Sequence, residues 1–450
     1  MATTYLSRTS GTPTNALKWT FSTWIKLGEV INGDRWLLDF NTDSNNRSQI
    51  GFAHDYSKPQ LIVYEKVSGS TSQLFFTAQA FRDPSAWMHI VVSCDRTLAT
   101  QEDRTKIYIN GERVTAFHST PTYPAQNTNG IINTAVSTLI GKYSQSTVYY
   151  NGSMTHVHFV DGTAYAASTF GETDSTSGIW KPKTAPSVTY GTNGFFLKME
   201  NSGAMGTDSS GNSNTFTVSG TLTQNVDTPS NVFATLNVLA STTSQNEFQY
   251  GNLEHYGTSN WTGAVTTLGA SSGKYYAEVK VTDRDNFSVG IVTLSGTAIN
   301  NINTNNNGKV GKYVDSWGIE GSGSNLYKGN NGSSSSYGSG FSNNDIAMIA
   351  LDVGTGSNGA VYFGKNGTWF DSGNPATGSN PAFSSLSFSD AVGFMSGLET
   401  GRVQWNFGQG YFGTTQVASA NADANGHGKM EYAVPTGYYT LNTKNLKEFG

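Results

Sequence analysis

The sequence predicts an all-β protein, and three observations lead to this prediction. First, apolar and polar residues alternate in short runs such as Trp19–Ile25, Gln60–Tyr64 and Tyr275–Val281, a period of two that is typical of strands. Second, 51 of the 450 residues are glycine, which is about 11% against a usual ~7%. Third, charged residues make up 13% of the chain, against a usual ~25%. Helical surfaces normally carry more Glu and Lys than this.

Aromatic residues supply the apolar surface that a folded core needs. Phe, Trp and Tyr together make up 12% of the chain, which excludes global disorder. The polar remainder is rich in Ser, Thr, Asn and Gly, which suits outward strand faces and turns. Because 450 residues exceed one ordinary core, we expect two antiparallel β-sandwich (jelly-roll-like) domains in tandem.

Turn signals separate the expected strands. Asn110-Gly111 stands between two strand-like runs and predicts a two-residue hairpin, because both residues tolerate positive φ. Asn366-Gly367 predicts a second hairpin in the same way. No stretch keeps an apolar period of 3.6 over ten residues, so helices should be short and few, with one near Ala166–Phe170.

A segment without alternation divides the chain. Residues 226–245 include a proline and lack the strand pattern, so we interpret them as a connecting segment between domains at 1–225 and 246–450. Pro229–Asn237 within this segment resembles Pro435–Asn442 near the end of the sequence. Similar extended segments are therefore expected on both sides of the second domain.

Charge and cysteine content exclude several classes of function. The chain has 27 Lys and Arg against 32 Asp and Glu and no basic block, so a nucleic acid partner is not expected. Cys94 is the single cysteine and lies in an apolar run, which excludes a disulfide scaffold and predicts a buried thiol. The first residues show no signal-peptide pattern, and the longest apolar runs, such as Ile346–Leu351, are too short to cross a membrane.

No catalytic residue is expected. Concanavalin-like glycan hydrolases need a strand of the form Glu-x-Asp-x-x-Glu, which places two carboxyl groups on one face. The nearest approach is Glu172 with Asp174, which lacks the third acid and lies in a Gly/Ser-rich stretch. A nucleophilic triad cannot be read from residue spacing, since triads assemble through the fold.

Two groups of residues in the sequence have side chains that can bind a metal ion. His156 and His158 stand two apart on an expected strand and would share one face, but no third ligand lies nearby, so an ordinary pair is preferred. Asp283 with Asp285, and Asp39 with Asp43, could offer oxygen atoms to calcium. Aspartate is more common as a turn former. No cofactor is therefore predicted, and calcium stays open.

Two low-complexity stretches, 300–308 and 321–340, are expected to be long loops with a functional or mobile character. Trp317, Tyr327 and Tyr337 lie in or beside the second stretch. Aromatic rings among small polar residues suit carbohydrate, because rings cover the apolar faces of sugars. We therefore predict these three as ligand-binding residues. The alternative is that the rings cap the core and the loop is only flexible.

Residues 19–225 resemble the laminin-G/concanavalin-A-like sandwich. Four landmarks occur in the order of that family, namely an early core strand, a Trp-x-His strand, a hairpin with Asn-Gly, and the closing strands: Phe21–Lys26, Trp87–Asp95, Lys106–Val114, and Leu139–Lys142 with Tyr150–Phe159. Position 155 departs from the family, which often has Asp there. The resemblance implies a sandwich without a transferable set of calcium ligands.

Residues 246–445 resemble a SPRY-type sandwich. Five motifs occur in family order: Ser272–Val279, Ser288–Ile291, Asp345–Asp352, Val361–Gly367 and Val403–Gly408. This resemblance implies a binding module without catalytic residues, in which the loops determine the partner.

The tandem of these two domains, with Phe170–Pro182 before the junction and Asp227–Asn237 at it, is similar to structural proteins of tailed bacteriophages, notably marine ones. The resemblance implies a virion component such as a tail fibre, a receptor-binding protein or a capsid-surface protein. It covers nearly the whole chain.

These observations predict a non-enzymatic phage virion structural protein on the particle surface, acting as a tail fibre or receptor-binding adhesin that recognises host-surface carbohydrate. Its expected partners are other virion proteins and host glycan. Exposed strand edges favour association, so a homo-oligomer is expected, with a trimer suggested by analogy to fibres. One alternative is a capsid decoration or head-fibre protein with a purely structural role, and another is a carbohydrate-active enzyme.

Overall fold

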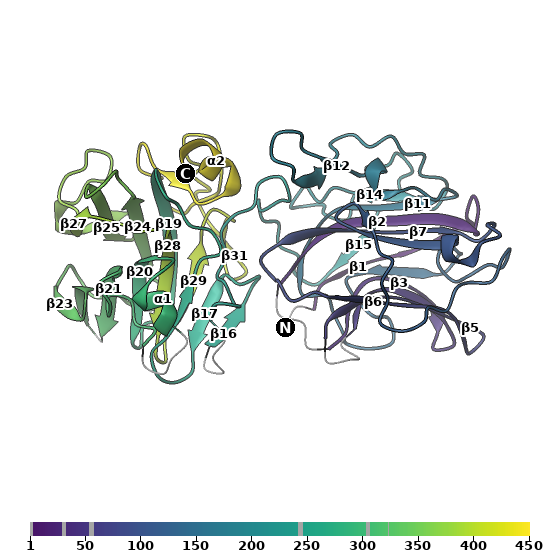
Figure 1. Cartoon of the computed structure of the whole chain (residues 1–450), viewed down its shortest axis with the longest axis horizontal. Helices are drawn as coiled ribbons and strands as arrows, with labels where there is room; N and C mark the ends of the chain where they lie inside the picture. The colour runs from purple at the N-terminus through teal and green to yellow at the C-terminus, as the bar shows by residue number, and fades with distance from the viewer. Residues whose placement is uncertain (1–2, 29–32, 54–57, 242–245, 303–306, 323) are drawn as a thin grey trace. The chain divides into compact units, whose positions relative to one another are not determined.

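The structure, a computed structural model, confirms a nearly all-β fold. The chain divides into two compact units, Met1–Gln224 and Asn225–Gly450. Each unit contains two larger sheets, built almost entirely from antiparallel strands (Figure 1). The described residues are 3–28, 33–53, 58–241, 246–302, 307–322 and 324–450.

Unit 1 contains a seven-stranded and a six-stranded sheet. The first sheet has, in spatial order, β15 (Thr217–Ser219), β1 (Tyr5–Thr9), β10 (Ser137–Ile140), β3 (Arg35–Asp43), β4 (Asn46–Ala53), β5 (Gln60–Val67) and β6 (Ser70–Ala80). The second has β14 (Phe195–Leu197), β11 (Gly152–Asp161), β2 (Lys18–Leu27), β7 (Trp87–Asp95), β8 (Thr105–Ile109) and β9 (Glu112–Arg113). The remaining elements are the pair β12 (Gly171–Thr173) and β13 (Trp180–Pro182), and the 3-10 turns η1 (Gln101–Asp103) and η2 (Ala167–Thr169).

The core of unit 1 lies between its two sheets. On β2, Trp19, Phe21 and Ile25 are buried in this core, because alternate side chains of a strand share one face. Phe40 on β3 contributes from the facing sheet, with its ring 5.4 Å from that of Phe159 on β11. Cys94 is buried in the same core, as predicted.

Unit 2 contains a nine-stranded and a six-stranded sheet. The first has β16 (Asn246–Gln249), β17 (Glu254–Gly257), β29 (Arg402–Asn406), β19 (Lys274–Asp283), β24 (Ile346–Asp352), β25 (Gly359–Lys365) and β26 (Thr368–Trp369), with β27 (Phe383–Leu386) on β25 and β32 (Tyr439–Thr440) parallel to β19. The second has β18 (Thr262–Val265), β28 (Val392–Leu398), β20 (Phe287–Thr293), β21 (Ser316–Ser322), β22 (Asn325–Asn330) and β23 (Ser333–Ser336). The remaining elements are the pair β30 (Tyr411–Phe412) and β31 (Thr415–Gln416), the helices α1 (Thr297–Asn301) and α2 (Thr443–Phe449), and the turn η3 (Phe370–Ser372).

The segment expected to connect the domains is packed into unit 2. Ala234 and Leu236 are buried in the core of unit 2, and Leu236 pairs with Thr266 at the end of β18. A free connector would expose these apolar side chains to water, which burial avoids. Within 226–245, residues 242–245 lie outside the described residues.

The two similar segments of the sequence lie side by side in unit 2. Phe233 pairs with Asn442 in antiparallel fashion. The amide of Ala234 donates to the carbonyl of Leu441 at 3.0 Å, and the amide of Thr443 donates to the carbonyl of Val232 at 2.9 Å. The beginning and the end of unit 2 are therefore joined by main-chain hydrogen bonds.

Both predicted hairpins are confirmed. Asn110 and Gly111, both with positive φ, join β8 to β9, and Asn366 and Gly367 join β25 to β26 in the same way. The stretch 321–340 is not a long loop, however. It contains the end of β21 and the hairpin β22–β23, while residue 323 and residues 303–306 of the other stretch lie outside the described residues.

Helices are short and few, as predicted. The turn η2 lies within the expected stretch 166–170. Helix α2 was not predicted, because seven residues are too few to show a helical period. Its N-cap is Asn442, whose side chain accepts a hydrogen bond from the amide of Asn445. None of the helices in the described part of the chain is long and apolar enough to cross a membrane.

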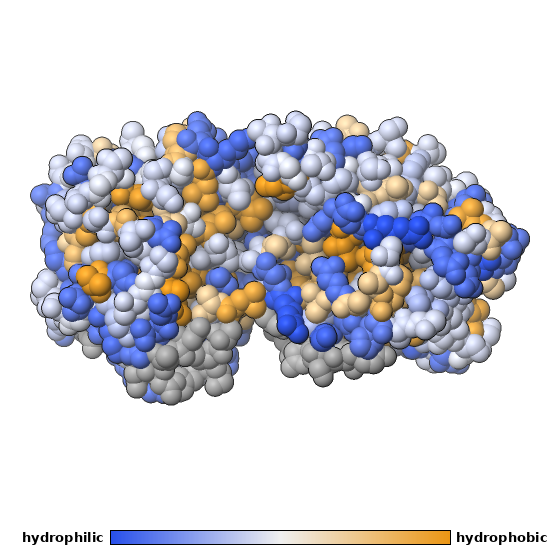
Figure 2. All heavy atoms as spheres, viewed as in Figure 1, coloured by the Kyte–Doolittle hydropathy of each residue, from blue (hydrophilic) through white to orange (hydrophobic). Residues whose placement is uncertain are grey.

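The surface is polar without being strongly charged. Figure 2 shows pale and blue residues over much of the visible face, with hydrophobic residues gathered in a few places between them. Exposed large apolar side chains are isolated in the sequence: Ile179, Val218, Leu239, Tyr250 and Val314. Single apolar residues of this kind are normal on a protein surface, so a binding site has to be found from its local chemistry.

Candidate functional site

Two of the three predicted ligand-binding residues are core residues. Trp317 on β21 is buried, and its ring meets that of Phe388 edge-on, with centroids 5.4 Å apart. Tyr337, directly after β23, is also buried, and its ring lies 5.5 Å from that of Phe370. Neither ring presents a face to a ligand in this structure. These positions favour the alternative, in which the two rings complete the core.

Tyr327 lies on the opposite face of the same sheet. It is half-buried on β22, where its neighbour Leu326 faces the core, so Tyr327 faces outward. It lies across from Glu320 on β21 and Ser336 on β23. The structure therefore does not bring Tyr327 together with Trp317, and its role in binding stays a prediction.

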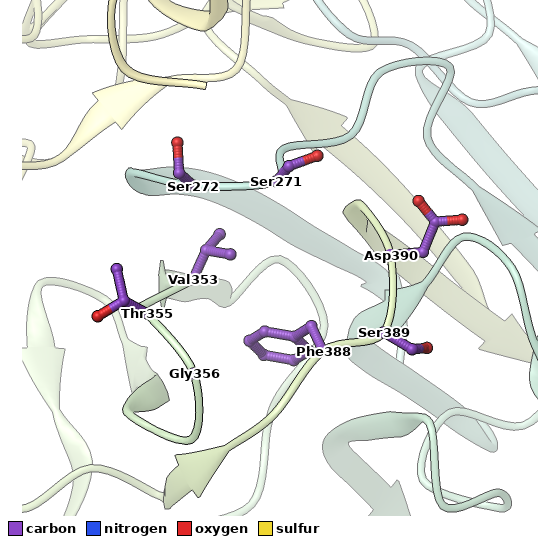
Figure 3. A pocket seen from close by; sticks show the side chains of 9 residues that line it. Ser271, Ser272, Val353, Thr355, Gly356, Phe388, Ser389 and Asp390 are labelled. Atoms are coloured by element: carbon purple, nitrogen blue, oxygen red, sulfur yellow. The ribbon is translucent and has the colours of Figure 1, made fainter.

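A hollow of about 510 Å³ lies where three loops of unit 2 meet. The loops contribute Ser271–Ser272 before β19, residues 353–356 after β24, and residues 388–390 before β28. In Figure 3 the ring of Phe388 lies in the middle of these loops, with Ser271 and Asp390 on one side and Thr355 on the other. We call this feature the loop hollow.

Backbone bonds hold the loop hollow in shape. The amide of Val353 donates to the carbonyl of Gly273 at 3.0 Å, which joins two of the loops. The amide of Gly354 donates to the Asp352 carboxylate at 3.0 Å, and Gly354 has a φ of 64°, a conformation that glycine adopts without steric cost. The ring contact between Phe388 and Trp317 fixes the third loop on the core.

The side chains of the loop hollow have unused bonding capacity. Ser271, Thr355 and Ser389 are exposed, and their hydroxyl groups bond to no other described residue. Hydrogen bonds from Ser295 and from the amide of Ala391 lower the pKa of Asp390, so this exposed carboxyl group is ionised at neutral pH. The hollow thus offers a half-buried ring, free hydroxyl groups and one anionic acceptor.

Unit 1 contains a buried Ser–His contact that could be mistaken for a catalytic pair. Ser22 Oγ lies 2.9 Å from His89 Nε2, and the indole Nε1 of Trp180 donates to His89 Nδ1 at 3.0 Å. Because an indole N–H can only donate, Nδ1 is the acceptor and the ring proton is on Nε2. His89 therefore donates to Ser22 and cannot accept its proton. The hydrogen bond from Trp180 to His89 joins β13 to β7 of the six-stranded sheet.

Lowering the pH from 7 to 5 is expected to destabilise unit 1. Burial lowers the pKa of His89 to about 3 and that of His158 well below its usual value. A histidine in the unfolded chain takes up a proton near pH 6.5, whereas the buried histidine does not. The free energy of unfolding is therefore highest above pH 6.5 and decreases as the pH falls toward 3. His89 alone should lower the free energy of unfolding by about 2 kcal/mol between pH 6.5 and 5. Calorimetric unfolding at pH 7, 6 and 5 measures this.

His89→Gln is the matched variant, because glutamine keeps a donor and an acceptor but does not titrate in this range. Its unfolding midpoint should depend less on pH than that of the unchanged chain. The stability of unit 2 should still depend on pH in this variant, since burial lowers the pKa of His255 to about 3. Equal pH dependence in the two proteins would contradict the neutral state of His89.

The histidine pair of β11 takes part in packing. A β-bulge lies between Thr155 and His158, and His156 has a positive φ. The ring of His158 stacks on Phe196 at 3.9 Å, and its Nδ1 lies 2.8 Å from the hydroxyl of Tyr190. The ring of His156 is also near Phe196, at 6.2 Å. The two rings share a side of the sheet, where Tyr190 and Phe196 surround His158.

The acid pair nearest to a hydrolase pattern lies in the β12–β13 hairpin, with Glu172 on β12 and Asp174 in the turn. Lys181 Nζ lies 2.9 Å from Asp174 and 3.8 Å from Glu172. Asp174 also accepts hydrogen bonds from the amides of Thr176 and Ser177. The hydrogen bond from Lys181 is the main cause of the lowered pKa of Asp174. Asp174 is therefore ionised, whereas a general acid has to hold a proton.

The calcium candidates do not form ligand sets. Asp39 and Asp43 are four residues apart on β3, which separates them by about 13 Å at the usual strand rise; calcium ligands all lie within about 2.6 Å of the ion. Asp39 is buried and accepts from Gln49 at 2.8 Å. Asp283 accepts from the amide of Asp285 in a turn. Among the described residues, no three His, Cys, Asp or Glu side chains gather as a metal group.

Comparisons with known families agree with both sandwiches. Residues 2–168 match the model of the concanavalin A-like lectin/glucanases superfamily, and residues 274–410 match that of the SPRY domain. The chain is a concanavalin A-like sandwich followed by a SPRY sandwich. The loop hollow belongs to the SPRY sandwich. No curated protein sequence gives a match.

Solved structures similar to this chain include three SPRY-type domains. The TRIM65 PSpry domain is 15% identical, with 38% of this chain and 89% of that chain covered and a TM-score of 0.28. The SPRY domain of human HERC1 is 15% identical, covering 38% and 96%, with a TM-score of 0.29. A human SPRY domain is 17% identical, covering 36% and 94%, with a TM-score of 0.26.

Sequence reasoning did not find the residues of the loop hollow. They come from three stretches that lie far apart in the sequence and are short and rich in Ser and Gly, as much of this chain is. Phe388 within Ser387-Phe388-Ser389-Asp390 was the available signal, since it is an aromatic residue between polar ones directly before a strand.

Proposed function

We propose that this chain is a non-catalytic, carbohydrate-binding structural protein exposed on the particle of a tailed bacteriophage, and that the loop hollow of the SPRY sandwich is its sugar site. The composition of the loop hollow carries the assignment of the sugar site. The virion role is supported by the similarity of the tandem to phage structural proteins. A tail fibre or receptor-binding adhesin is the form of virion protein that needs such a site.

The loop hollow suits a saccharide for physical reasons. The C–H faces of a pyranose ring can cover the ring of Phe388, which is half-buried in the middle of the hollow (Figure 3). The ionised carboxylate of Asp390 can accept hydrogen bonds from two neighbouring sugar hydroxyl groups. The free hydroxyls of Ser271, Thr355 and Ser389 can donate or accept, as sugars require. A volume of about 510 Å³ falls within the range of ordinary ligand pockets.

The absence of catalysis is supported by the state of the candidate groups. His89 holds its proton on the nitrogen that faces Ser22, so it cannot serve as a base for that hydroxyl. Asp174 is ionised and bonded within its own turn. Its partner in the hydrolase-like pattern, Glu172, lies on β12 and pairs with Lys181 at 3.8 Å.

Phe388→Ala and Asp390→Asn are each expected to weaken binding of host-envelope polysaccharide by about tenfold, because each removes one of the two strongest contacts. Purified chain is measured against the isolated polysaccharide by calorimetry or biolayer interferometry. Asp390→Asn is the more conservative change, since the side chain is exposed and keeps its size. Its unfolding midpoint should match that of the unchanged chain.

Tyr327→Ala is the comparison variant. Tyr327 lies on the outer face of the sheet and does not line the loop hollow. The proposal made here therefore expects binding to be retained, whereas the prediction from the sequence expects it to be lost. Loss of binding in this variant, with normal binding in the two hollow variants, would indicate that the sugar binds on the outer face of the sheet. Normal binding in all three would exclude both sites.

The location on the particle needs a separate measurement. Immunogold labelling of intact particles with antibody against this chain should mark the tail if the protein is an adhesin. Label over the head would favour the alternative role in capsid decoration, and unlabelled particles would overturn the exposed-virion proposal.

A further inference from the structure

The lining of the loop hollow carries a single charge. Asp390 is the one charged residue in it, and the other lining residues are serine, threonine, glycine, valine and phenylalanine. Figure 3 shows Asp390 on the same side of the Phe388 ring as Ser271 and Ser389. A ligand in the hollow therefore meets one negative charge from the lining and no positive one.

Asp390 is not neutralised by a cation. Its carboxylate accepts hydrogen bonds from the amide of Ala391, at 2.7 Å, and from the side chain of Ser295, and both donors are uncharged. No basic residue in the described part of the chain contributes to its lowered pKa. A carboxylate offers about four positions to hydrogen-bond donors, so this one can accept further bonds from a ligand.

The charges that flank the lining segments pair with each other. Lys274 follows Ser272 by two positions, and Asp352 directly precedes Val353. The Nζ of Lys274 lies 2.8 Å from the Asp352 carboxylate. The same carboxylate accepts from the amide of Gly354 at 3.0 Å, a kind of main-chain group that can attract anions when it is free. Neither this lysine nor this amide is left to hold an anionic ligand.

We propose that the loop hollow prefers sugars with a protonated amino group to neutral sugars, and neutral sugars to acidic ones. This inference rests on the proposed function, since it names the class of sugar that the same site selects.

The chemistry of the three classes of sugar explains this order. A primary ammonium group brings three N–H donors that need acceptors. The Asp390 carboxylate is a charged acceptor, and the hydroxyl groups of Ser271 and Ser389 on the same side are neutral ones. Hydrogen bonds between charged groups are stronger than those between neutral groups. A sugar carboxylate would instead meet a like charge and no basic side chain in the lining, which weakens its binding.

The ring of Phe388 should not contribute to this preference. All three classes of sugar present similar C–H faces to an aromatic ring, so the difference between them depends on Asp390. The difference should be moderate, because this side chain is exposed and exposed ion pairs contribute little free energy. It should also decrease as salt is added, since salt screens exposed charges.

The test titrates the full-length chain with glucosamine, glucose and glucuronate at neutral pH and equal ionic strength, with saturation-transfer NMR or calorimetry as readout. Glucosamine is expected to bind about threefold to fivefold more tightly than glucose, and glucuronate about threefold more weakly. N-acetylglucosamine has a neutral group on the same carbon and should bind less tightly than glucosamine. Equal affinities for the amino, neutral and acidic sugars would overturn the preference and leave the proposed sugar site in place. If none of these sugars bound, and the host polysaccharide did not bind either, the proposed function would be overturned as well.

Matched variants separate the charge of Asp390 from the net charge of the chain. Asp390→Asn keeps the size of the side chain and one acceptor oxygen, and should bring the affinities for glucosamine and glucose close together. Asp285→Asn removes the same charge from an exposed turn outside the hollow and should keep the preference. Asp390→Lys should reverse the order of glucosamine and glucuronate. An unchanged preference in Asp390→Asn, or an equal loss of preference in Asp285→Asn, would contradict the inference.

Discussion

Trp317→Ala is expected to destabilise unit 2 by about 3–5 kcal/mol, the usual cost of removing a buried aromatic side chain. Its ring is buried between the sheets and meets Phe388 edge-on. The truncation removes the apolar contacts and leaves a cavity that the surrounding strands fill only in part. Urea unfolding followed by tryptophan fluorescence or circular dichroism measures the change. Sugar binding should weaken as well, because the contact with Trp317 fixes Phe388 of the loop hollow.

Tyr327→Ala provides the contrast, since this side chain lies on the outer face of the same sheet. Surface changes of this kind usually cost less than about 1 kcal/mol. If the two variants had equal stability, the core position of Trp317 would be refuted.

Arg96→Met is expected to destabilise unit 1 by about 3–5 kcal/mol, because it leaves an unpaired charge in the interior. Arg96 Nη2 lies 2.8 Å from Glu65 Oε1, and the exposed fractions of the two side chains are 2% and 1%. The carboxylate of Glu65 also accepts from the amide of Ile131 at 2.9 Å and from Ser72 Oγ at 2.7 Å. Without the guanidinium, these neutral donors alone would have to stabilise the buried anion. Chemical unfolding of the variant measures the loss.

Glu65→Gln combined with Arg96→Met tests the reason for this loss. The double variant removes both charges, and the glutamine oxygen can still accept from Ile131. Replacing a buried ion pair by neutral residues is often close to neutral in stability, so the double variant should recover most of the loss. A double variant that is less stable than Arg96→Met would show that lost packing, and not an unpaired charge, causes the effect.

The hairpins show where sequence reasoning succeeded and where it failed. Asn110-Gly111 and Asn366-Gly367 were recognised because apolar strands flank them. Asn331-Gly332 also has positive φ at both residues and joins β22 to β23. It was missed because β23 consists of four exposed serines, so no apolar alternation marks the strand. β23 is a strand because it pairs with β22. Its own sequence has no pattern from which this pairing could be predicted.

The candidate site was harder to predict than the fold, for a related reason. An aromatic residue beside a Gly/Ser-rich stretch has the same local sequence whether its ring faces the core or solvent. Trp317 and Tyr337 face the core, and Tyr327 faces outward. The loop hollow is formed by three loops that meet only when the two sheets have folded. Their closeness in space cannot be predicted from their positions in the sequence. The fold class needed only the strand period and the turn residues.

The pairing of the two ends of unit 2 has a mechanical consequence. Residues 232–234 and 441–443 are held together by a short ladder of main-chain bonds, so the unit enters and leaves its fold at one place. A module with adjacent ends can be placed inside a loop of another protein without stretching its host. The same geometry means that tension applied between residues 231 and 444 is carried first by these few bonds. These bonds would break one after another, starting with the one between Thr443 and Val232, while the strand pairing within the two sheets remains intact.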